Sequence, residues 1–298
     1  MHVTHVRRRV AWAGALTLVA SLAPDIVVLE AAGSLPAWWL PAKAALLLAG
    51  AGAMHRVARD GPVAGYGLLL AVVVAMQAVM VHAGGSAWWR AWFEAGTFTG
   101  EIGGTITLKL LTAVPIVGVL LLVTRSPRAA FLVPGDLRAK AARIGWLGIP
   151  EGTIAWGRLA ILAGLAIAIG TLLLTLLTVT GFALPPNLDR LWPALPLIVV
   201  LALANSFVEG VAYRNAVLGP LAGALPKGAV ALLSAAFFGV AHFYGAPSGI
   251  VGVIMSGVLG WFLARGMYET RGFLAPWIIH FLQDVVIFST ILLLGGLS

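Results

Sequence analysis

The sequence contains no cysteine and little charge. Without cysteine the chain has no disulfide, no thiolate metal ligand and no cysteine nucleophile. Charged residues make up 10% of the 298 positions and hydrophobic residues 60%, whereas soluble proteins contain about 25% charged residues. Because so few polar groups cannot cover a globule in water, the composition excludes an ordinary soluble domain. It predicts a polytopic integral membrane protein whose first partner is the lipid bilayer.

Acidic residues are scarcer than basic ones. The 19 lysines and arginines against 11 acidic residues give a net charge of +8. The basic residues flank apolar runs instead of forming one stripe, so nucleic acid is not an expected partner. The abundance of alanine, glycine, leucine and arginine suggests a bacterial source, and therefore the bacterial cytoplasmic (inner) membrane.

The sequence contains many long apolar runs. A helix of about 20 apolar residues crosses the bilayer core, and the sequence predicts about nine such helices. The predicted spans are 11–31, 38–55, 62–82, 103–124, 157–180, 192–213, 228–244, 249–266 and 273–296. The fold class is therefore all-α, a membrane helical bundle. The second and eighth spans are short, so each could be tilted, broken or re-entrant.

Basic residues are concentrated in alternate loops, which predicts the orientation. By the positive-inside rule the N-terminus and the basic loop 125–156 are cytoplasmic, and the C-terminus faces out. Asp25 and Glu30 interrupt the first apolar run, so we expect a retained helix and not a cleaved signal peptide. Within the basic loop, residues 136–147 are predicted to form a short amphipathic helix on the inner leaflet.

Seven ionisable residues lie inside the predicted spans, where each costs several kcal/mol unless it is paired or hydrated. They are Asp25, Lys43, Lys109, Glu209, His242, His280 and Asp284. The first three lie toward the outer ends of their spans. For these we expect lysine side chains that extend to the membrane surface, or a structural ion pair between Asp25 and one lysine.

The other four ionisable residues come from three late spans. Residues four apart share a helical face. The pairs with this spacing are Glu209 and Tyr213, Phe238 and His242, and His280 and Asp284. Arg214 is five positions beyond Glu209, which is about 140° around a regular α-helix, so we expect it to point elsewhere.

This set of side chains suits hydrolysis. A carboxylate held away from bulk water is a competent general base toward water, and a nearby histidine can hold that water or pass on a proton. The same residues would also suit a proton-coupled carrier, a purely structural network, or a Zn²⁺ site with Glu209, His242 and His280 as ligands. The spacing alone leaves these alternatives open, and no other hydrolase or phosphate-binding motif is present.

Four short motifs follow one another on these spans. They are Asn205-Ser206-Phe207-Val208-Glu209-Gly210-Val211-Ala212-Tyr213-Arg214, Phe238-Gly239-Val240-Ala241-His242, Ser256-Gly257-Val258-Leu259-Gly260-Trp261-Phe262 and His280-Phe281-Leu282-Gln283-Asp284. In this order they resemble the Glu-Glu-x-x-x-Arg, Phe-x-x-x-His, Gly-Trp-Phe and His-x-x-x-Asn/Asp motifs of the CPBP family. These are the CAAX-protease and bacteriocin-processing intramembrane endopeptidases, also called Abi proteins.

The resemblance implies a glutamate-dependent endopeptidase that needs no metal or other cofactor. Glu209 would activate water with the help of His242, and His280 and Asp284 would hold the oxyanion or position a peptide or membrane-protein substrate. Substrate binding or structural support would come from Asn205, Tyr213, Arg214 and Phe238. The protease core would span 181–298, after the N-terminal transmembrane helices of 1–180. The sequence indicates no oligomeric state.

Two positions depart from the family pattern. Gly210 stands where a second glutamate is usual, and Asp284 stands where asparagine is common. An ionised aspartate cannot donate a hydrogen bond to an oxyanion. Gly210 in particular favours an alternative, a catalytically inactive CPBP-like membrane protein with an immunity, scaffold or transport role. A zinc-dependent membrane hydrolase is a further alternative.

Overall fold

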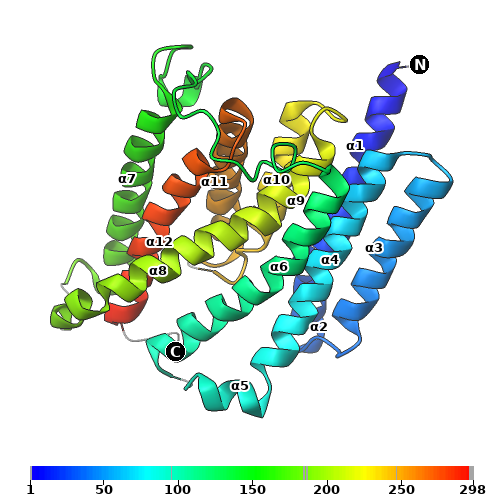
Figure 1. Cartoon of the computed structure of the whole chain (residues 1–298). Helices are drawn as coiled ribbons and strands as arrows, with labels where there is room; N and C mark the ends of the chain where they lie inside the picture. Colours follow the sequence, from blue (N-terminus) through cyan, green and yellow to red (C-terminus); the bar gives the residue numbers. More distant parts are fainter. Residues whose placement is uncertain (1, 95, 184, 186, 246, 295–298) are drawn as a thin grey trace.

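The computed structural model describes residues 2–94, 96–183, 185, 187–245 and 247–294. The chain is 77% helical, and the described residues contain no strand (Figure 1). The predicted all-α class is therefore confirmed. Length and apolar composition make the chain an integral membrane protein.

Seven helical segments are long and apolar enough to cross a bilayer. They are α1–α2 (His2–Ala20 and Ala23–Ala32), α4 (Gly61–Gly84), η1–α6 (Thr99–Gly103 and Gly104–Thr124), α7–η3 (Trp156–Thr175 and Leu176–Thr180), η4–α8–η5–α9 (Leu188–Arg190, Leu191–Gly210, Val211–Asn215 and Ala216–Leu221), α11 (Gly249–Thr270) and α12 (Leu274–Leu294). Helix α5 (Ala87–Trp92) is a short connection.

Two of the nine predicted spans correspond to less apolar or shorter helices. Helix α3 (Trp39–Arg56) has 18 residues but carries Lys43 and two basic residues in its last turn, and α10 (Lys227–Val240) has only 14 residues. A count of nine crossings therefore stays a prediction. The expectation that the eighth span is short was wrong, because α11 continues to Thr270 and has 22 residues.

The first span is broken into α1 and α2, and a buried ion pair closes the break. Pro24 lies in the first turn of α2, a position that tolerates its missing N–H, whereas a helix interior does not. The ammonium of Lys43 lies 2.6 Å from Asp25 and donates to the carbonyl of Ser21 at 2.9 Å. The predicted structural ion pair of Asp25 is thus confirmed, with Lys43 as its partner.

The basic segments lie at one end of the bundle. In Figure 1 the start of α1, the α3–α4 connection, the basic loop and the α11–α12 turn all lie toward the top of the view. This grouping agrees with the loop alternation that the charges indicate. The cytoplasmic location of that end stays a prediction, since it rests on the positive-inside rule alone.

The predicted amphipathic helix at 136–147 is wrong. Only a 3₁₀ turn at Gly145–Leu147 forms there, and an antiparallel bridge joins Ile144 to Ile149. The loop backbone finds hydrogen-bond partners across the loop, so a helix is not needed to satisfy it. Glu269 on α11 then anchors the loop by accepting from the backbone N–H of Ala142 at 2.9 Å.

One hydrophobic core crosses the predicted boundary at residue 180. Leu47 on α3 and Tyr66 on α4 are fully buried in the same cluster as Val217 and Leu218 on α9. Figure 1 shows α8 crossing the bundle diagonally, with α12 and α7 on one side and α6 and α4 on the other. The division into 1–180 and 181–298 stays a prediction, and the packing across it brings N-terminal side chains to the C-terminal helices.

Candidate active site

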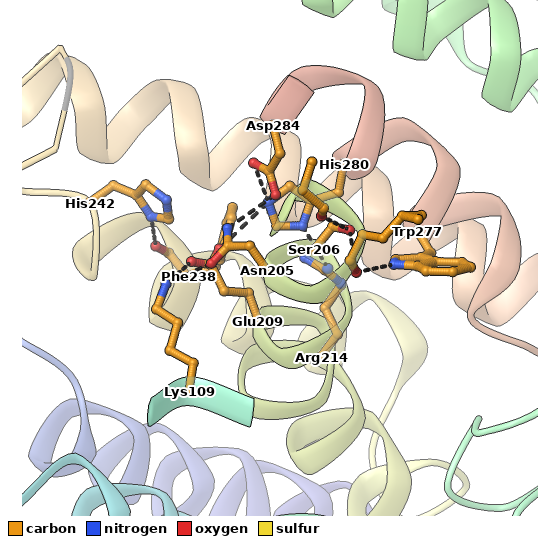
Figure 2. A network of polar contacts seen from close by, with 12 residues as sticks. Lys109, Asn205, Ser206, Glu209, Arg214, Phe238, His242, Trp277, His280 and Asp284 are labelled. Carbon is orange, nitrogen blue, oxygen red and sulfur yellow. Dashed lines mark hydrogen bonds and ion pairs between the residues drawn. The ribbon is translucent and has the colours of Figure 1, made fainter. Parts of the chain in front are cut away.

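Glu209 on α8 lies at the centre of a polar network inside the bundle (Figure 2). Its Oε1 lies 2.6 Å from the Nζ of Lys109 on α6, and its Oε2 lies 3.5 Å from the Nε2 of His280 on α12. The apolar segment around Glu209 runs from Leu188 to Leu221, beyond the predicted end at 213. Glu209 is therefore well inside the segment and not near its end.

Asn205 and Asp284 complete the network. Asn205 lies one helical turn before Glu209. Its side-chain Oδ1 accepts from Lys109 at 2.8 Å, and its side-chain Nδ2 donates to Asp284 at 3.1 Å. Asp284 lies 3.6 Å from the Nε2 of His280. Contacts of 3.5 and 3.6 Å are longer than hydrogen bonds, and such gaps are where a water bridges polar groups or a site tightens on its substrate.

The expectation that Arg214 points away from the site was wrong. Residues Val211–Asn215 form a π-helical turn, whose i→i+5 hydrogen bonding brings residues five apart onto one face. Arg214 is therefore turned toward the network: its Nη2 lies 3.1 Å from the Nδ1 of His280, and the side chain is 2% exposed. The error came from assuming an unbroken α-helix.

Arg214 determines which nitrogen of His280 carries the proton. A guanidinium only donates hydrogen bonds, so the Nδ1 of His280 accepts from Arg214. The neutral imidazole then has its proton on Nε2, which faces both Glu209 and Asp284. In this arrangement His280 is a hydrogen-bond donor toward the carboxylates and not a general base.

His242 lies beside the network but not in it. It follows the last residue of α10 by two positions, and its Nδ1 donates to the carbonyl of Phe238 at 2.8 Å. Among the described residues His242 forms no ion-pair contact with a carboxylate, whereas His280 does. Both imidazoles contact the Phe238 ring, with centroids 4.4 Å away for His242 and 5.6 Å for His280. The bond to a carbonyl leaves Nε2 of neutral His242 as an acceptor.

The Phe238 ring is held in place by small residues and aromatic neighbours. A Cβ on Gly260 of α11 would lie 3.0 Å from the Phe238 ring, so the ring packs closely against this glycine. Tyr213 packs edge-on against the same ring, and Ser234 of α10 donates to the Tyr213 carbonyl at 2.8 Å. Phe238 thus packs against both histidines and Tyr213 packs against Phe238, and their role as support for the site stays a prediction.

Lys109 is the site residue that the sequence analysis misassigned. We expected its side chain to extend to the membrane surface, but its ammonium lies between Asn205 and Glu209. The signal was present, because a lysine inside an apolar span marks a functional position by default. Position along the helix could not reveal its partner, which is 100 residues away in the sequence.

Gly210 leaves space beside Arg214. A Cβ on Gly210 would lie 3.2 Å from the Nη2 of Arg214, and within the described part of the chain the buried Nη1 of Arg214 has no hydrogen-bond partner. A void of about 10 Å³ borders both residues and Trp277, a volume that holds roughly one water. The position where the CPBP pattern has its second glutamate is thus next to the Arg214 guanidinium, on the side of the nitrogen that is bonded to His280.

The zinc ligand set considered from the sequence does not fit this arrangement. Within the described part of the chain, no three His, Cys, Asp or Glu side chains are grouped so that they could hold a metal ion. Glu209 already faces the ammonium of Lys109, and the Nδ1 of His280 faces the guanidinium of Arg214. Two cations against the supposed ligands oppose a third cation at the same place.

Residues 191–286 match the family model described as "Type II CAAX prenyl endopeptidase Rce1-like". The chain therefore carries an Rce1-like domain of the CPBP family, as the motifs predicted. This domain contains Glu209, Arg214, His242, His280 and Asp284. The match supports a membrane-embedded protease. No curated protein and no solved structure matches the chain.

Proposed function

We propose that this protein is an intramembrane glutamic endopeptidase in which Glu209 is the general base toward water. The observation that carries the proposal is the position of Glu209, largely buried between Lys109 and His280 inside an endopeptidase-like domain. A carboxylate with cationic and N–H neighbours is held ionised and oriented, which a base must be before it takes a proton.

The reaction divides among the residues around Glu209. The carboxylate removes a proton from water while the water oxygen attacks the scissile carbonyl carbon, which gives a tetrahedral oxyanion. Glu209 then returns the proton to the departing amine nitrogen as the C–N bond breaks. His242, with Nε2 as an acceptor, would hold the attacking water, and the Nε2–H of His280 would keep the two carboxylates in position.

The substrate class we propose is a peptide or a membrane-protein segment. An apolar groove of about 690 Å³ between α10 and α11 reaches Gly239, the neighbour of Phe238, so an apolar segment could lie beside the site. The name of the matched family refers to prenylated CAAX proteins. For a chain of bacterial composition in an inner membrane, an unprenylated segment is the substrate that we propose.

Cleavage by the purified protein tests this function. In detergent micelles, the wild type should cleave members of a pool of quenched fluorescent peptides, and Glu209→Gln should lower the rate by about 10²–10⁴-fold, the usual contribution of a general base. Glu151→Gln, which changes an exposed carboxylate of the basic loop, is the matched control and should keep full activity. Cleavage that persists in Glu209→Gln would remove the proposed base.

The ion pair of Glu209 also supports the non-catalytic alternative. A carboxylate 2.6 Å from an ammonium is a weaker base, and Gly210 supplies no second acid. A non-catalytic protein would cleave no peptide in the same assay, and Glu209→Gln would then change only binding or stability. A chelator added to an active preparation separates the metal-free reaction, which should continue, from a zinc-dependent one, which should stop.

A further inference from the structure

Lys109 comes from outside the Rce1-like domain. It lies on α6, whereas the matched residues are 191–286, so the family match assigns it no role. Its ammonium can donate three hydrogen bonds. Two of them are made, to Asn205 at 2.8 Å and to Glu209 at 2.6 Å. Among the described residues no third acceptor is bonded to the ammonium, so one N–H remains for a further acceptor.

Lys109 is also the most accessible cation of the network. Its side chain is 28% exposed, compared with 13% for Glu209 and 3% for His280. Arg214 is 2% exposed and lines the small void near Gly210. The remaining proton of His280 faces Glu209 and Asp284. Among these three donors, Lys109 therefore has the most exposed side chain.

We propose that Lys109 is a catalytic residue whose third N–H binds the scissile carbonyl oxygen and stabilises the oxyanion. This inference rests on the proposed function of Glu209. Hydrogen bonds aimed at a developing oxyanion inside a water-poor site are among the largest contributions to catalysis.

The charge balance of the reaction explains why a lysine next to the base suits this role. When water attacks, one O–H bond breaks and its proton moves to Glu209, while the carbonyl electron pair moves onto oxygen. Negative charge thus leaves the carboxylate and appears on the oxyanion. Lys109 loses its ionic partner in that step, so its attraction to the oxyanion is stronger in the transition state than in the ground state. Collapse of the oxyanion, with the proton passing to the amine, restores the original ion pair.

The test compares Lys109→Met with Lys109→Gln. Both remove the charge, and glutamine keeps two N–H donors for Asn205 and Glu209, so it keeps the test valid if the methionine variant fails to fold. With the peptide that the wild type cleaves, kcat should fall by about 10²–10³-fold, the usual loss for one oxyanion donor, while KM changes little. The exposed Lys227 provides the matched control, and Lys227→Met should keep wild-type kcat.

A phosphinic isostere of the same peptide separates catalysis from structural support. This anionic, tetrahedral group mimics the oxyanion, so its inhibition constant should rise with Lys109→Gln in proportion to the loss in kcat/KM. Loss of kcat with unchanged phosphinate affinity, or a kcat within about threefold of wild type, would overturn the role of Lys109. If Glu209→Gln is inactive and Lys109→Gln is active, only this inference fails. If Glu209→Gln cleaves as fast as the wild type, the proposed function fails as well.

Discussion

Two ion pairs inside the bundle have equal lengths but different surroundings. Lys43–Asp25 and Lys109–Glu209 both measure 2.6 Å. In the first pair the side chains are 6% and 1% exposed, and Trp39 adds a further hydrogen bond to Asp25. In the second they are 28% and 13% exposed, and His280 faces Glu209 across a gap longer than a hydrogen bond.

The difference teaches that the surroundings of an ion pair, and not its length, distinguish structure from chemistry. The Lys43–Asp25 pair is shut off from solvent, and Lys43 also binds the carbonyl that the α1–α2 break leaves unpaired. The buried Oδ2 of Asp25 has no hydrogen-bond partner among the described residues. The Lys109–Glu209 pair keeps an unused N–H and a carboxylate oxygen without a short contact to His280. A pair that is shut off from solvent serves the fold, whereas a partly exposed pair can be reached by a substrate or water.

Neutralising the two carboxylates, one at a time, should give the largest difference in activity between the two pairs. Glu209→Gln is expected to lose cleavage by about 10²–10⁴-fold because the general base is gone, yet it should fold, since the amide oxygen still accepts from Lys109. Asp25→Asn should keep wild-type kcat in the folded fraction. Peptide cleavage, normalised to folded protein by size-exclusion chromatography, measures both. Equal activity losses in the two variants would mean that both pairs are structural.

The stability effects should run in the opposite order. Asp25→Asn leaves the Lys43 ammonium buried without its counter-charge, which costs about 3–5 kcal/mol in free energy of unfolding. Glu209→Gln should cost far less, because Lys109 is partly exposed. Thermal unfolding in detergent, followed by intrinsic tryptophan fluorescence, provides the measurement. A melting temperature that falls more for Glu209→Gln than for Asp25→Asn would reverse the assignment of the two pairs.

Arg214 offers a smaller and more specific effect. Arg214→Met removes the donor to the Nδ1 of His280, so the imidazole can then carry its proton on either nitrogen. We expect about a tenfold loss in kcat, equivalent to about 1.4 kcal/mol, with a change in tautomer visible in the ¹⁵N NMR shifts of histidine-labelled protein. Unchanged shifts for His280 would show that Arg214 does not determine the tautomer.

The smallest predicted effect concerns Gly210. An alanine in a helix interior is more stable than glycine by about 0.5–1 kcal/mol, but a Cβ at this position would lie 3.2 Å from Arg214. Gly118 on α6 has open space around it, so Gly118→Ala should gain the full amount. Gly210→Ala should gain less stability, because the new methyl group crowds Arg214. Thermal unfolding of the two variants measures the difference. An equal gain at both sites would mean that Arg214 moves freely.

The candidate site could be predicted in part. Glu209, His242, His280 and Asp284 were recognisable because ionisable groups in apolar spans are costly and therefore conspicuous. The expected direction of Arg214 was wrong because its local sequence does not predict the π turn that rotates it toward His280. Lys109 was noticed but misassigned, since a single span carries no information about which helix its face will meet.

The sequence by itself determined that this protein lies in a bilayer and that its fold is all-α, and it located the seven long apolar helices. Apolar length and scarce charge require a bilayer, and backbone hydrogen bonding inside lipid requires helices. Only the tertiary structure decided which polar groups meet. Lys109 and Glu209 are 100 residues apart and pair because α6 packs beside α8, while Asp25 and Lys43 pair across a helix break. Packing between helices, which depends on all their surfaces together, shut one pair off from solvent and left the other partly exposed.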